Sequence, residues 1–195
     1  MATTWLISDT HFGHENCCTK FKKADGSPLR PFACAEEMDE EMVKRWNERV
    51  KPNDKVYHLG DVVIAKRHLA TLGRLNGDKV LIKGNHDIFK LEDYTRYFRD
   101  IRGYHVLNGM ILSHIPVHES NLYRFGTNIH GHLHDNRVMT FSAYRANGMD
   151  KIDPNYYSVC VEQTDFAPIS LEEVKENIIK QGGTVGFKNG NGATM

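Results

Sequence analysis

Five short stretches of the sequence place aspartate, histidine or asparagine directly after an apolar run. They are SDTH (8–11), GD (60–61), GNHD (84–87), SH (113–114) and GHLH (131–134). A tight turn would explain the glycines and Asn85, which tolerate left-handed backbone angles, but it would not call for the histidines. Imidazole and carboxylate groups without thiolates suit Mn, Fe, Co, Ni or Zn better than Ca or Mg. The five stretches therefore predict a site for transition metal ions.

Short strands are the elements that would position these side chains. Runs rich in β-branched, leucine or aromatic residues predict strands at 3–8, 55–60, 79–84, 109–114, 127–132 and 156–162. Between the first two, Met38, Met42 and Trp46 recur every four residues, which predicts an amphipathic helix over 35–50. A shorter leucine stripe follows at 69–75. Strands that alternate with helices predict an α/β layered fold.

The C-terminal part of the chain predicts one more helix and then a tail. Ser170 precedes Glu173 by three positions, which is the spacing of a capping box, and Gly182 is a stop signal. Residues 183–195 are rich in glycine and asparagine and predict a flexible tail. We therefore expect a single domain over 1–182, followed by the tail 183–195.

The polar stretches should meet at one place in such a fold. Sites in open α/β sheets form beyond the carboxyl ends of the strands, so strand ends that are distant in sequence converge there. The side-chain period of two in extended chain should also put Asp9 with His11, and His132 with His134, on one side.

Two divalent ions would account for the whole set of side chains. Asp61 can bridge them, one ion taking Asp9, His11 and His134 and the other Asn85, His114 and His132. Two ions carry four positive charges, and two aspartates and a bridging hydroxide remove three, so the remaining charge suits an anionic phosphoryl group. His86 is then free to protonate the departing oxygen or to bind the phosphate.

The same five stretches, in the same order, resemble the calcineurin-like metallophosphoesterase family. RPF (30–32) and FAPISLEEVKE (166–176) are similar to its small bacterial and phage branch. The resemblance implies a four-layer α/β/β/α sandwich, a dinuclear centre at the carboxyl ends of the strands, and hydrolysis of phosphate mono- or diesters. It implies His86 as the catalytic histidine and gives metal-ligand roles to Asp9, His11, Asp61, Asn85, His114, His132 and His134.

One position departs from the family pattern. Relatives such as the protein phosphatases carry an aspartate three residues after the bridging one, where it orients the catalytic histidine, but this chain has Ile64. The GDxxDRG continuation of those phosphatases is also missing, which argues against a phosphoprotein substrate. Either Asp87 or no side chain supports His86.

Other residues are weaker candidates. Arg30, His14 and His118 could bind substrate, although packing or solvent exposure explains each of them as well. We expect His58 to be a core histidine, and His130 to be either a partner of a ligand carboxylate or a structural residue.

Composition narrows the function classes. The 25 basic and 25 acidic residues give a formal net charge of zero, so no stable nucleic-acid complex is expected. No apolar run reaches membrane-spanning length, no charged leader is evident, and the four cysteines lack CxxC spacing. These features predict a reduced, cytoplasmic protein without a membrane association.

The sequence thus predicts a dinuclear phosphoesterase that acts on small phosphodiesters, cyclic nucleotides among them. Catalysis would use a metal-bridging hydroxide, with His86 assisting the leaving group. Mn is the favoured metal, with Fe, Ni, Co or Zn as alternatives. A broad phosphomonoesterase is the alternative, followed by a nuclease and a non-catalytic metal-binding module. Metallo-β-lactamase-like hydrolases also use HxH, but their HxHxDH pattern is broken by Asn136 and Arg137. The native substrate and the oligomeric state stay open.

Overall fold

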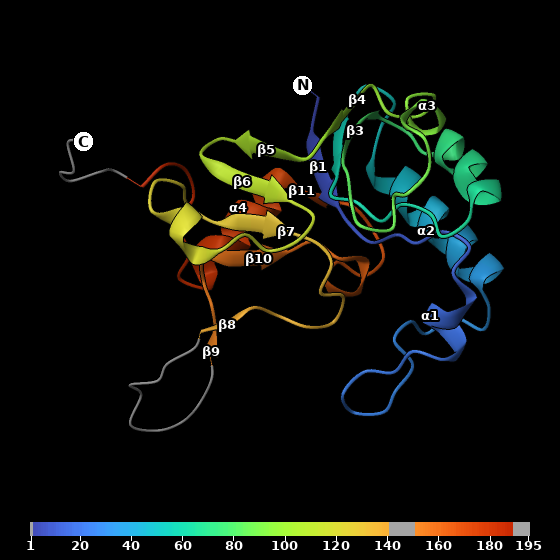
Figure 1. Ribbon diagram of the computed structural model, residues 1–195, viewed down its shortest axis with the longest axis horizontal. Helices are drawn as coiled ribbons and strands as arrows, with labels where there is room; N and C mark the ends of the chain where they lie inside the picture. The colour runs from blue at the N-terminus through green and yellow to red at the C-terminus, as the bar shows by residue number, and fades with distance from the viewer. Residues whose placement is uncertain (1, 141–150, 189–195) are drawn as a thin grey trace.

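Two β-sheets packed face to face form the centre of the protein (Figure 1). The computed structural model describes residues 2–140 and 151–188. The first sheet has the order β11-β1-β2-β3-β4, built from Ile169–Ser170, Thr4–Ile7, Lys55–His58, Asp78–Ile82 and Asp100–Arg102. The second has the order β10-β7-β6-β5, built from Tyr156–Ser158, Asn128–His130, Met110–Ser113 and Tyr104–Leu107. A separate two-stranded sheet joins β8 (Met139–Thr140) to β9 (Lys151–Ile152).

Helices cover the outer face of the first sheet (Figure 1). These are α1 (Glu15–Thr19), α2 (Ala35–Arg49), the 3-10 helix η1 (Lys66–Arg74) and α3 (Leu91–Tyr94). The α2 stripe of Met38, Met42 and Trp46 is buried against Ile7 and Val56 of the sheet, as its four-residue period predicts.

The opposite face of the first sheet packs on the second sheet. Leu6 and Val80 from one sheet share a buried cluster with Leu112 and Ile129 from the other. Helix α4 (Leu171–Lys180) adds its apolar side to that cluster, and the capping box of Ser170 and Glu173 is present at its start.

The outer face of the second sheet carries a thin layer. There, Ile111 and Tyr156 pack against Leu122 of the 3-10 helix η2 (Glu119–Leu122). The predicted α/β/β/α order of layers is confirmed, with the short η2 and its flanking loops as the fourth layer.

All six predicted strands are present, and each is shorter than its apolar run. Sequence reasoning missed the helices α1 and α3 and the strands β4, β5, β8, β9 and β11. β4 and β5 contain charged and polar residues that interrupt the apolar pattern, and β8, β9 and β11 are two residues long. The leucine stripe at 69–75 forms a 3-10 helix, which ends at Arg74.

The first residues of the predicted tail, 183–188, make hydrogen bonds to the domain. The hydroxyl of Thr127 donates to the carbonyl of Thr184 at 3.0 Å, and the N–H of Lys188 donates to the carbonyl of Arg124 at 3.0 Å. Residues 183–188 thus contact the loop that precedes β7, and the flexible tail stays a prediction. Residues 189–195 of that prediction lie outside the described residues.

Strand direction decides where the polar stretches end up. β1, β2 and β3 run parallel, and so do β6, β7 and β10. The carboxyl ends of each set lie at one edge of their sheet, and a parallel bridge between Ser8 and Cys160 brings the two edges together. All five stretches leave their strands there. Within the described residues, no helix has the length and apolar character needed to cross a membrane.

Candidate metal centre

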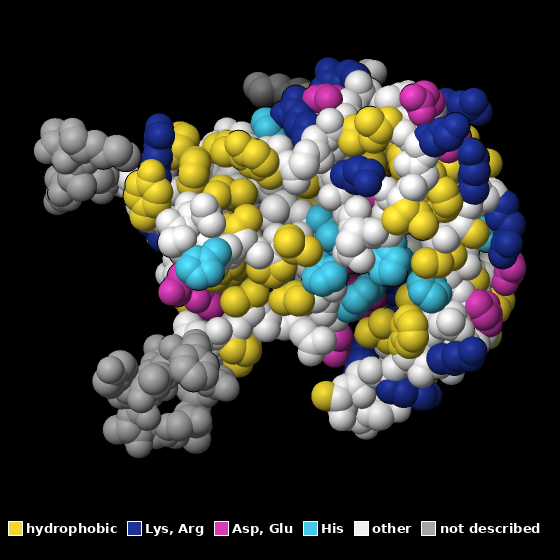
Figure 2. Space-filling view, viewed as in Figure 1, with side chains coloured by type: hydrophobic (Ala, Val, Ile, Leu, Met, Phe, Trp, Pro, Cys, Tyr) yellow, Lys and Arg dark blue, Asp and Glu magenta, His cyan; other side chains and the backbone are white. Residues whose placement is uncertain are grey.

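Two neighbouring clusters of aspartate and histidine lie at the carboxyl ends of the strands. Within each cluster, the potential ligand atoms lie within 4.8 Å of one another. The members are Asp9, His11 and His134 in one cluster, and Asp61, His114 and His132 in the other. Histidine side chains gather accordingly at the centre of the face shown in Figure 2.

Asp61 lies between the two clusters. Its Oδ2 is 3.5 Å from Nε2 of His11 and 3.4 Å from Nε2 of His114. Oδ1 of Asn85 lies 2.8 Å from the same His114 nitrogen, which adds an amide oxygen to the second cluster. The ring of His86 is 5.4 Å from that of His11, centroid to centroid. The structure thus brings together all eight of these predicted site residues.

Left-handed backbone turns aim most of these side chains. The described residues include eight non-glycine residues with positive φ, and five of them are predicted ligands: Asp9, His11, Asp61, His132 and His134. Such conformations cost on the order of 1 kcal/mol or more each, and they persist at functional sites where the surroundings impose them.

These turns correct one step of the sequence argument. Strand β1 ends at Ile7 and β7 at His130, so the paired ligands that follow are not in extended chain. His132 and His134 belong to different clusters, as the sequence assigned them, but both have positive φ, so the period of two does not apply to them. The predicted residues do lie together at the strand ends. The argument from alternating side chains, however, does not describe the backbone of these turns.

The carboxylate of Asp9 has one satisfied oxygen and one unsatisfied oxygen. Oδ2 accepts from the hydroxyl of Ser8, from the N–H of His132 at 2.8 Å and from the thiol of Cys160 at 3.2 Å. Oδ1 is buried, accepts no hydrogen bond from the described residues, and lies 3.7 Å from Nε2 of His11. A buried oxygen without a donor fits a cation as its missing partner.

The electrostatics around Asp9 favour an ionised ligand. Burial alone would raise the pKa of its carboxyl group, but His11 and the more distant His114 and His134 outweigh burial and hold the pKa far below its usual range. Metal binding requires the deprotonated carboxylate, so these surroundings suit a ligand.

Two imidazoles are oriented through their Nδ1 atoms. Nδ1 of His114 lies 2.8 Å from the carbonyl oxygen of Leu59, and Nδ1 of His134 lies 3.0 Å from Oε1 of Glu162. In each case the second ring nitrogen is left for the cluster, which is the usual arrangement of a metal-binding histidine. Burial lowers the pKa of His134, but the Glu162 carboxylate outweighs that effect and raises it.

Arg30 is buried and its guanidinium contacts groups of the protein, which does not favour its predicted role in binding substrate. Its side chain has no exposed surface. The guanidinium donates to Oε1 of Glu162 at 2.8 Å and to the backbone carbonyls of Asp9 and Thr10 at 2.6 and 2.8 Å. Arg30 thereby ties the turn that carries Asp9 and His11 to Glu162, which contacts His134.

Asp87 organises the backbone and does not support the imidazole of His86. It is fully buried, and its carboxylate accepts from the N–H groups of Asp61, Val62 and Gly84 at 2.8, 2.9 and 2.8 Å. These bonds fasten the turn after β2 to the turn after β3. The backbone N–H of His86 donates to Oδ1 of Asp61 at 2.8 Å, which leaves Oδ2 facing the clusters.

Close packing at two glycines completes the site. A Cβ atom on Gly84 would lie 2.2 Å from Oδ1 of Asp61, and one on Gly131 would lie 2.5 Å from Oδ2 of Asp9. Side chains at these positions would displace the carboxylates, so both glycines are required because of this close contact, and neither has a positive φ.

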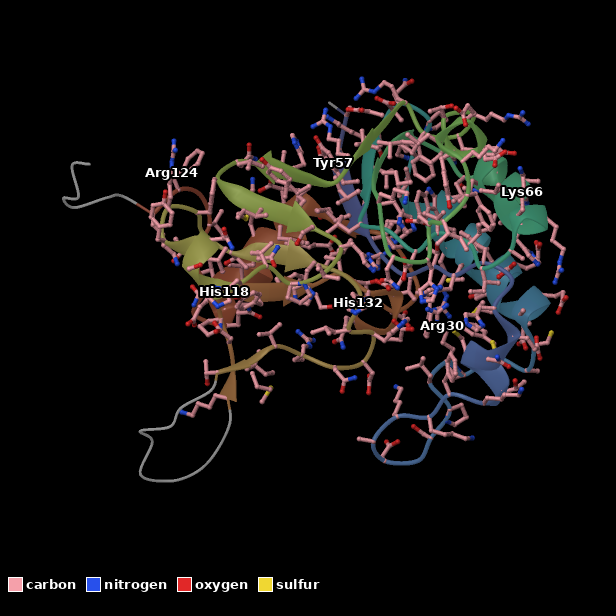
Figure 3. All side chains as sticks on the ribbon, viewed as in Figure 1. Arg30, Tyr57, Lys66, His118, Arg124 and His132 are labelled. Carbon is pink, nitrogen blue, oxygen red and sulfur yellow. The ribbon has the colours of Figure 1, made fainter. Side chains whose placement is uncertain are left out.

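The remaining histidines separate by location. The His14 ring lies 5.7 Å from that of His11, so His14 borders the site. His118 is exposed, accepts from the N–H of Ser120 to cap η2, and lies well away from His132 in Figure 3. His58 is buried as expected, and burial lowers its pKa to about 3. Nδ1 of His130 contacts the backbone carbonyl of Gly131. Of the two roles considered for His130, this contact favours the structural one over partnership with a ligand carboxylate.

Sequence reasoning missed the buried partners of the ligands. Ser8, Cys160 and Glu162 contact Asp9 or His134, yet only Ser8 belongs to one of the motifs. Cys160 and Glu162 lie in the run 156–162, and its apolar pattern predicts a strand but no contact with a ligand. The placement of charged Glu162 immediately after an apolar strand was the available signal.

Comparison with known proteins identifies the family. Residues 2–159 match the family model of the calcineurin-like phosphoesterases. The chain belongs to this family. It is therefore a metal-dependent phosphoester hydrolase by family, and the two clusters supply two possible metal sites.

The relatives of this phosphoesterase are themselves uncharacterised or named only as gene products. The chain is 35% identical over 188 residues to an uncharacterized protein of Methanocaldococcus jannaschii. The matched residues make up 92% of this chain and 93% of that protein. The chain is also 35% identical over 92 residues to the Gene 66 protein of Mycobacterium phage L5, covering 45% of this chain and 41% of that protein. A solved structure, a protein of unknown function from Aquifex aeolicus, superposes with a TM-score of 0.66 at 26% identity and covers 91% of this chain and all of that one.

Proposed function

We propose that this phosphoesterase hydrolyses small phosphodiesters, cyclic nucleotides among them, with His86 as the proton donor to the leaving oxygen. The position of Asp61 carries the proposal, because its Oδ2 lies between Nε2 of His11 and Nε2 of His114. A single carboxylate oxygen shared by two ligand clusters is the arrangement expected of a bridged pair of metal ions.

The ligand assignment follows the two clusters. Asp9, His11 and His134 would hold one ion, His114, His132 and Asn85 the other, and Asp61 would belong to both. The donor set of imidazole, carboxylate and amide oxygen without thiolate favours Mn among the first-row divalent ions, with Fe, Co, Ni and Zn as alternatives. When bound, such ions supply Lewis acidity for the phosphoryl oxygens and a water of lowered pKa.

His86 is placed to move a proton. It is exposed, and its backbone N–H is held by Oδ1 of Asp61 at 2.8 Å, so the position of its Cα is tied to the bridging residue. Its ring lies next to that of His11 and makes no hydrogen bond to another described side chain. A free imidazole at the mouth of a phosphoryl site can protonate a departing alkoxide or phenoxide.

The charge of the site favours diesters over monoesters. The guanidinium of Arg30, which contacts the turn of Asp9 and His11, donates to Glu162 and to backbone carbonyls. Its charge is therefore not offered to the second negative charge of a phosphomonoester. A nuclease would need a basic groove for a long polyanion, and the net charge of zero does not support one.

Hydrolysis of two nitrophenyl esters tests the proposal. Wild-type protein supplemented with Mn²⁺ should cleave bis-p-nitrophenyl phosphate with a higher kcat/KM than p-nitrophenyl phosphate. Asp61→Ala should lose at least one metal ion by elemental analysis. His86→Ala should keep its metal and lose turnover by roughly 10²–10⁴-fold, most for poor leaving groups.

His118→Ala is the matched control, because it removes an exposed histidine outside the clusters. Its kinetics should equal those of wild type. If the protein prefers the monoester, a phosphomonoesterase function is favoured over the proposed diesterase function. If neither ester is cleaved with any first-row metal, the enzymatic role is refuted.

A further inference from the structure

An apolar cleft opens beside the second ligand cluster. Its volume is about 660 Å³, which is in the range of sites that bind small organic molecules. One wall is the outer face of the β5–β6 pair, where Tyr104 lies opposite Ser113 and Val106 lies opposite Ile111. The other wall includes Val117 from the segment that follows β6.

The cleft is continuous with the metal centre. Asn85 and His114, which both belong to the second cluster, line one end of it. In Figure 2 hydrophobic side chains spread over β5 and β6 directly beside the group of histidines. A molecule whose phosphoryl group sits at the clusters can therefore extend its organic part into the cleft.

The lining combines exposed apolar surface with few polar groups. Tyr104 and Ile115 are 66% and 55% exposed, although both are large hydrophobic residues. The hydroxyl of Ser113 is already used, since it donates to the carbonyl of Ile115 at 2.6 Å. Charge enters the cleft through Lys83, which lies two residues before Asn85 and makes no ion pair with another described residue.

We propose that this cleft binds a planar aromatic group that stays attached to phosphorus during hydrolysis, an inference that rests on the proposed diesterase function. His86 lies beside His11 of the first cluster, whereas the cleft begins at His114 of the second. The leaving oxygen belongs on the side of its proton donor, so the opposite side receives the retained group.

A planar ring fits these walls better than a hydrated or highly charged group. Tyr104 offers an exposed aromatic face for offset stacking, and Val106, Ile111 and Val117 bury the other surfaces of a ring. Phenyl and nucleobase rings share this chemistry, so aryl and nucleoside esters are its two possible sources.

Esters with one common leaving group isolate the effect of the retained group. We would compare methyl, phenyl and thymidine-5′ p-nitrophenyl phosphate with the Mn²⁺-loaded protein. The phenyl ester should exceed the methyl ester in kcat/KM by at least roughly tenfold, which is the discrimination that an apolar pocket provides for one ring. A thymidine ester that exceeds the phenyl ester identifies a nucleoside site, and the reverse order identifies an aryl site.

Two tyrosine variants attribute the preference to the cleft. Tyr104→Ala should lower the phenyl-to-methyl ratio about three- to tenfold. Tyr123→Ala removes a similarly exposed tyrosine that does not line the cleft, and it should leave the ratio unchanged. Equal rates for methyl and phenyl esters in wild type, or a ratio that Tyr104→Ala does not change, overturns the proposal.

A binding measurement separates this proposal from the proposed function. With diamagnetic Zn²⁺ bound, phenylphosphonate should shift the methyl resonances of Val106, Ile111 and Val117, and methylphosphonate at the same concentration should not. If neither ester is hydrolysed but these shifts occur, the cleft assignment stands and the diesterase function fails. If the shifts are absent, the cleft assignment fails whether or not the esters are hydrolysed.

Discussion

The contact of Glu162 with Arg30 and His134 allows a quantitative test of how the metal centre is supported. Oε1 of Glu162 accepts from Nε of Arg30 at 2.8 Å, forms an ion pair with Nη2 of Arg30 at 2.8 Å, and lies 3.0 Å from Nδ1 of His134. The side chains of Arg30 and Glu162 are 0% and 1% exposed, so neither charge can turn to water if its partner is lost.

Each single substitution should therefore be costly. Glu162→Gln leaves the Arg30 guanidinium buried without a carboxylate, and Arg30→Met leaves the Glu162 carboxylate buried without a cation. Breaking a buried pair in this way costs about 3–5 kcal/mol in unfolding free energy. The double variant Arg30→Met with Glu162→Gln leaves no unpaired charge, so its loss should be smaller than the sum of the single losses by at least about 2 kcal/mol.

Urea unfolding in the presence of a chelator measures these losses without a contribution from metal binding. Glu172→Gln is the matched control, because its side chain is 76% exposed, and the change should stay within about 0.5 kcal/mol. Additive single losses, within about 0.5 kcal/mol, would show that the two charges do not depend on each other and would refute the reasoning.

Glu162→Gln should also weaken metal binding at one cluster and leave binding at the other unchanged. Glu162 holds His134, which belongs to the cluster of Asp9 and His11, and it touches no member of the second cluster. Loss of such a partner reduces metal affinity by about 10–100-fold. A calorimetric titration of Glu162→Gln with Mn²⁺ should therefore show one weakened and one unchanged site, and two unchanged sites would contradict the orienting role.

Three further perturbations test the surroundings of the site. Gly84→Ala should lower the bound metal from two ions per chain, measured by elemental analysis, because the new Cβ would lie 2.2 Å from Oδ1 of Asp61. Asp87→Asn places an amide NH₂ against backbone donors and should lower the unfolding free energy by about 2 kcal/mol or more in chemical denaturation, with loss below 0.5 kcal/mol speaking against it. His58 is neutral when folded, with a pKa of about 3 against 6.5 in its unperturbed form, because burial disfavours its charge. Only the unfolded chain binds this proton between those values, so the unfolding free energy should fall by roughly 2–3 kcal/mol between pH 6 and pH 4, and His58→Gln should reduce that slope.

The ligand types could be predicted from the sequence because the chemistry is written in residue identity. Five apolar runs that each end in aspartate, asparagine or histidine are sufficient to indicate a shared site, since the ends of parallel strands meet at one edge. The helix over 35–50 and the capping box at Ser170 were predictable for a similar reason, because their information is local.

The supporting residues could not be predicted in this way. Glu162 is 28 residues from His134 and 132 from Arg30, and nothing in the intervening sequence indicates these contacts. Arg30 shows the same limit, because an arginine in a loop after the first strand could equally face a substrate or the interior. Its burial depends on tertiary contacts, among them those with Met38 of α2 and with Glu162.

The sequence by itself determined which side chains can bind metal and that they leave successive strands at a common edge. The tertiary structure decided how the backbone delivers these side chains, because Asp9, His11, Asp61, His132 and His134 lie in left-handed turns and not in extended strands. Those turns cost free energy locally, and contacts from distant parts of the chain, such as Arg30 with Asp9 and Asp87 with Asp61, offset the cost. A conformation that depends on distant partners cannot be inferred from residue order, because those partners meet only once the two sheets have formed.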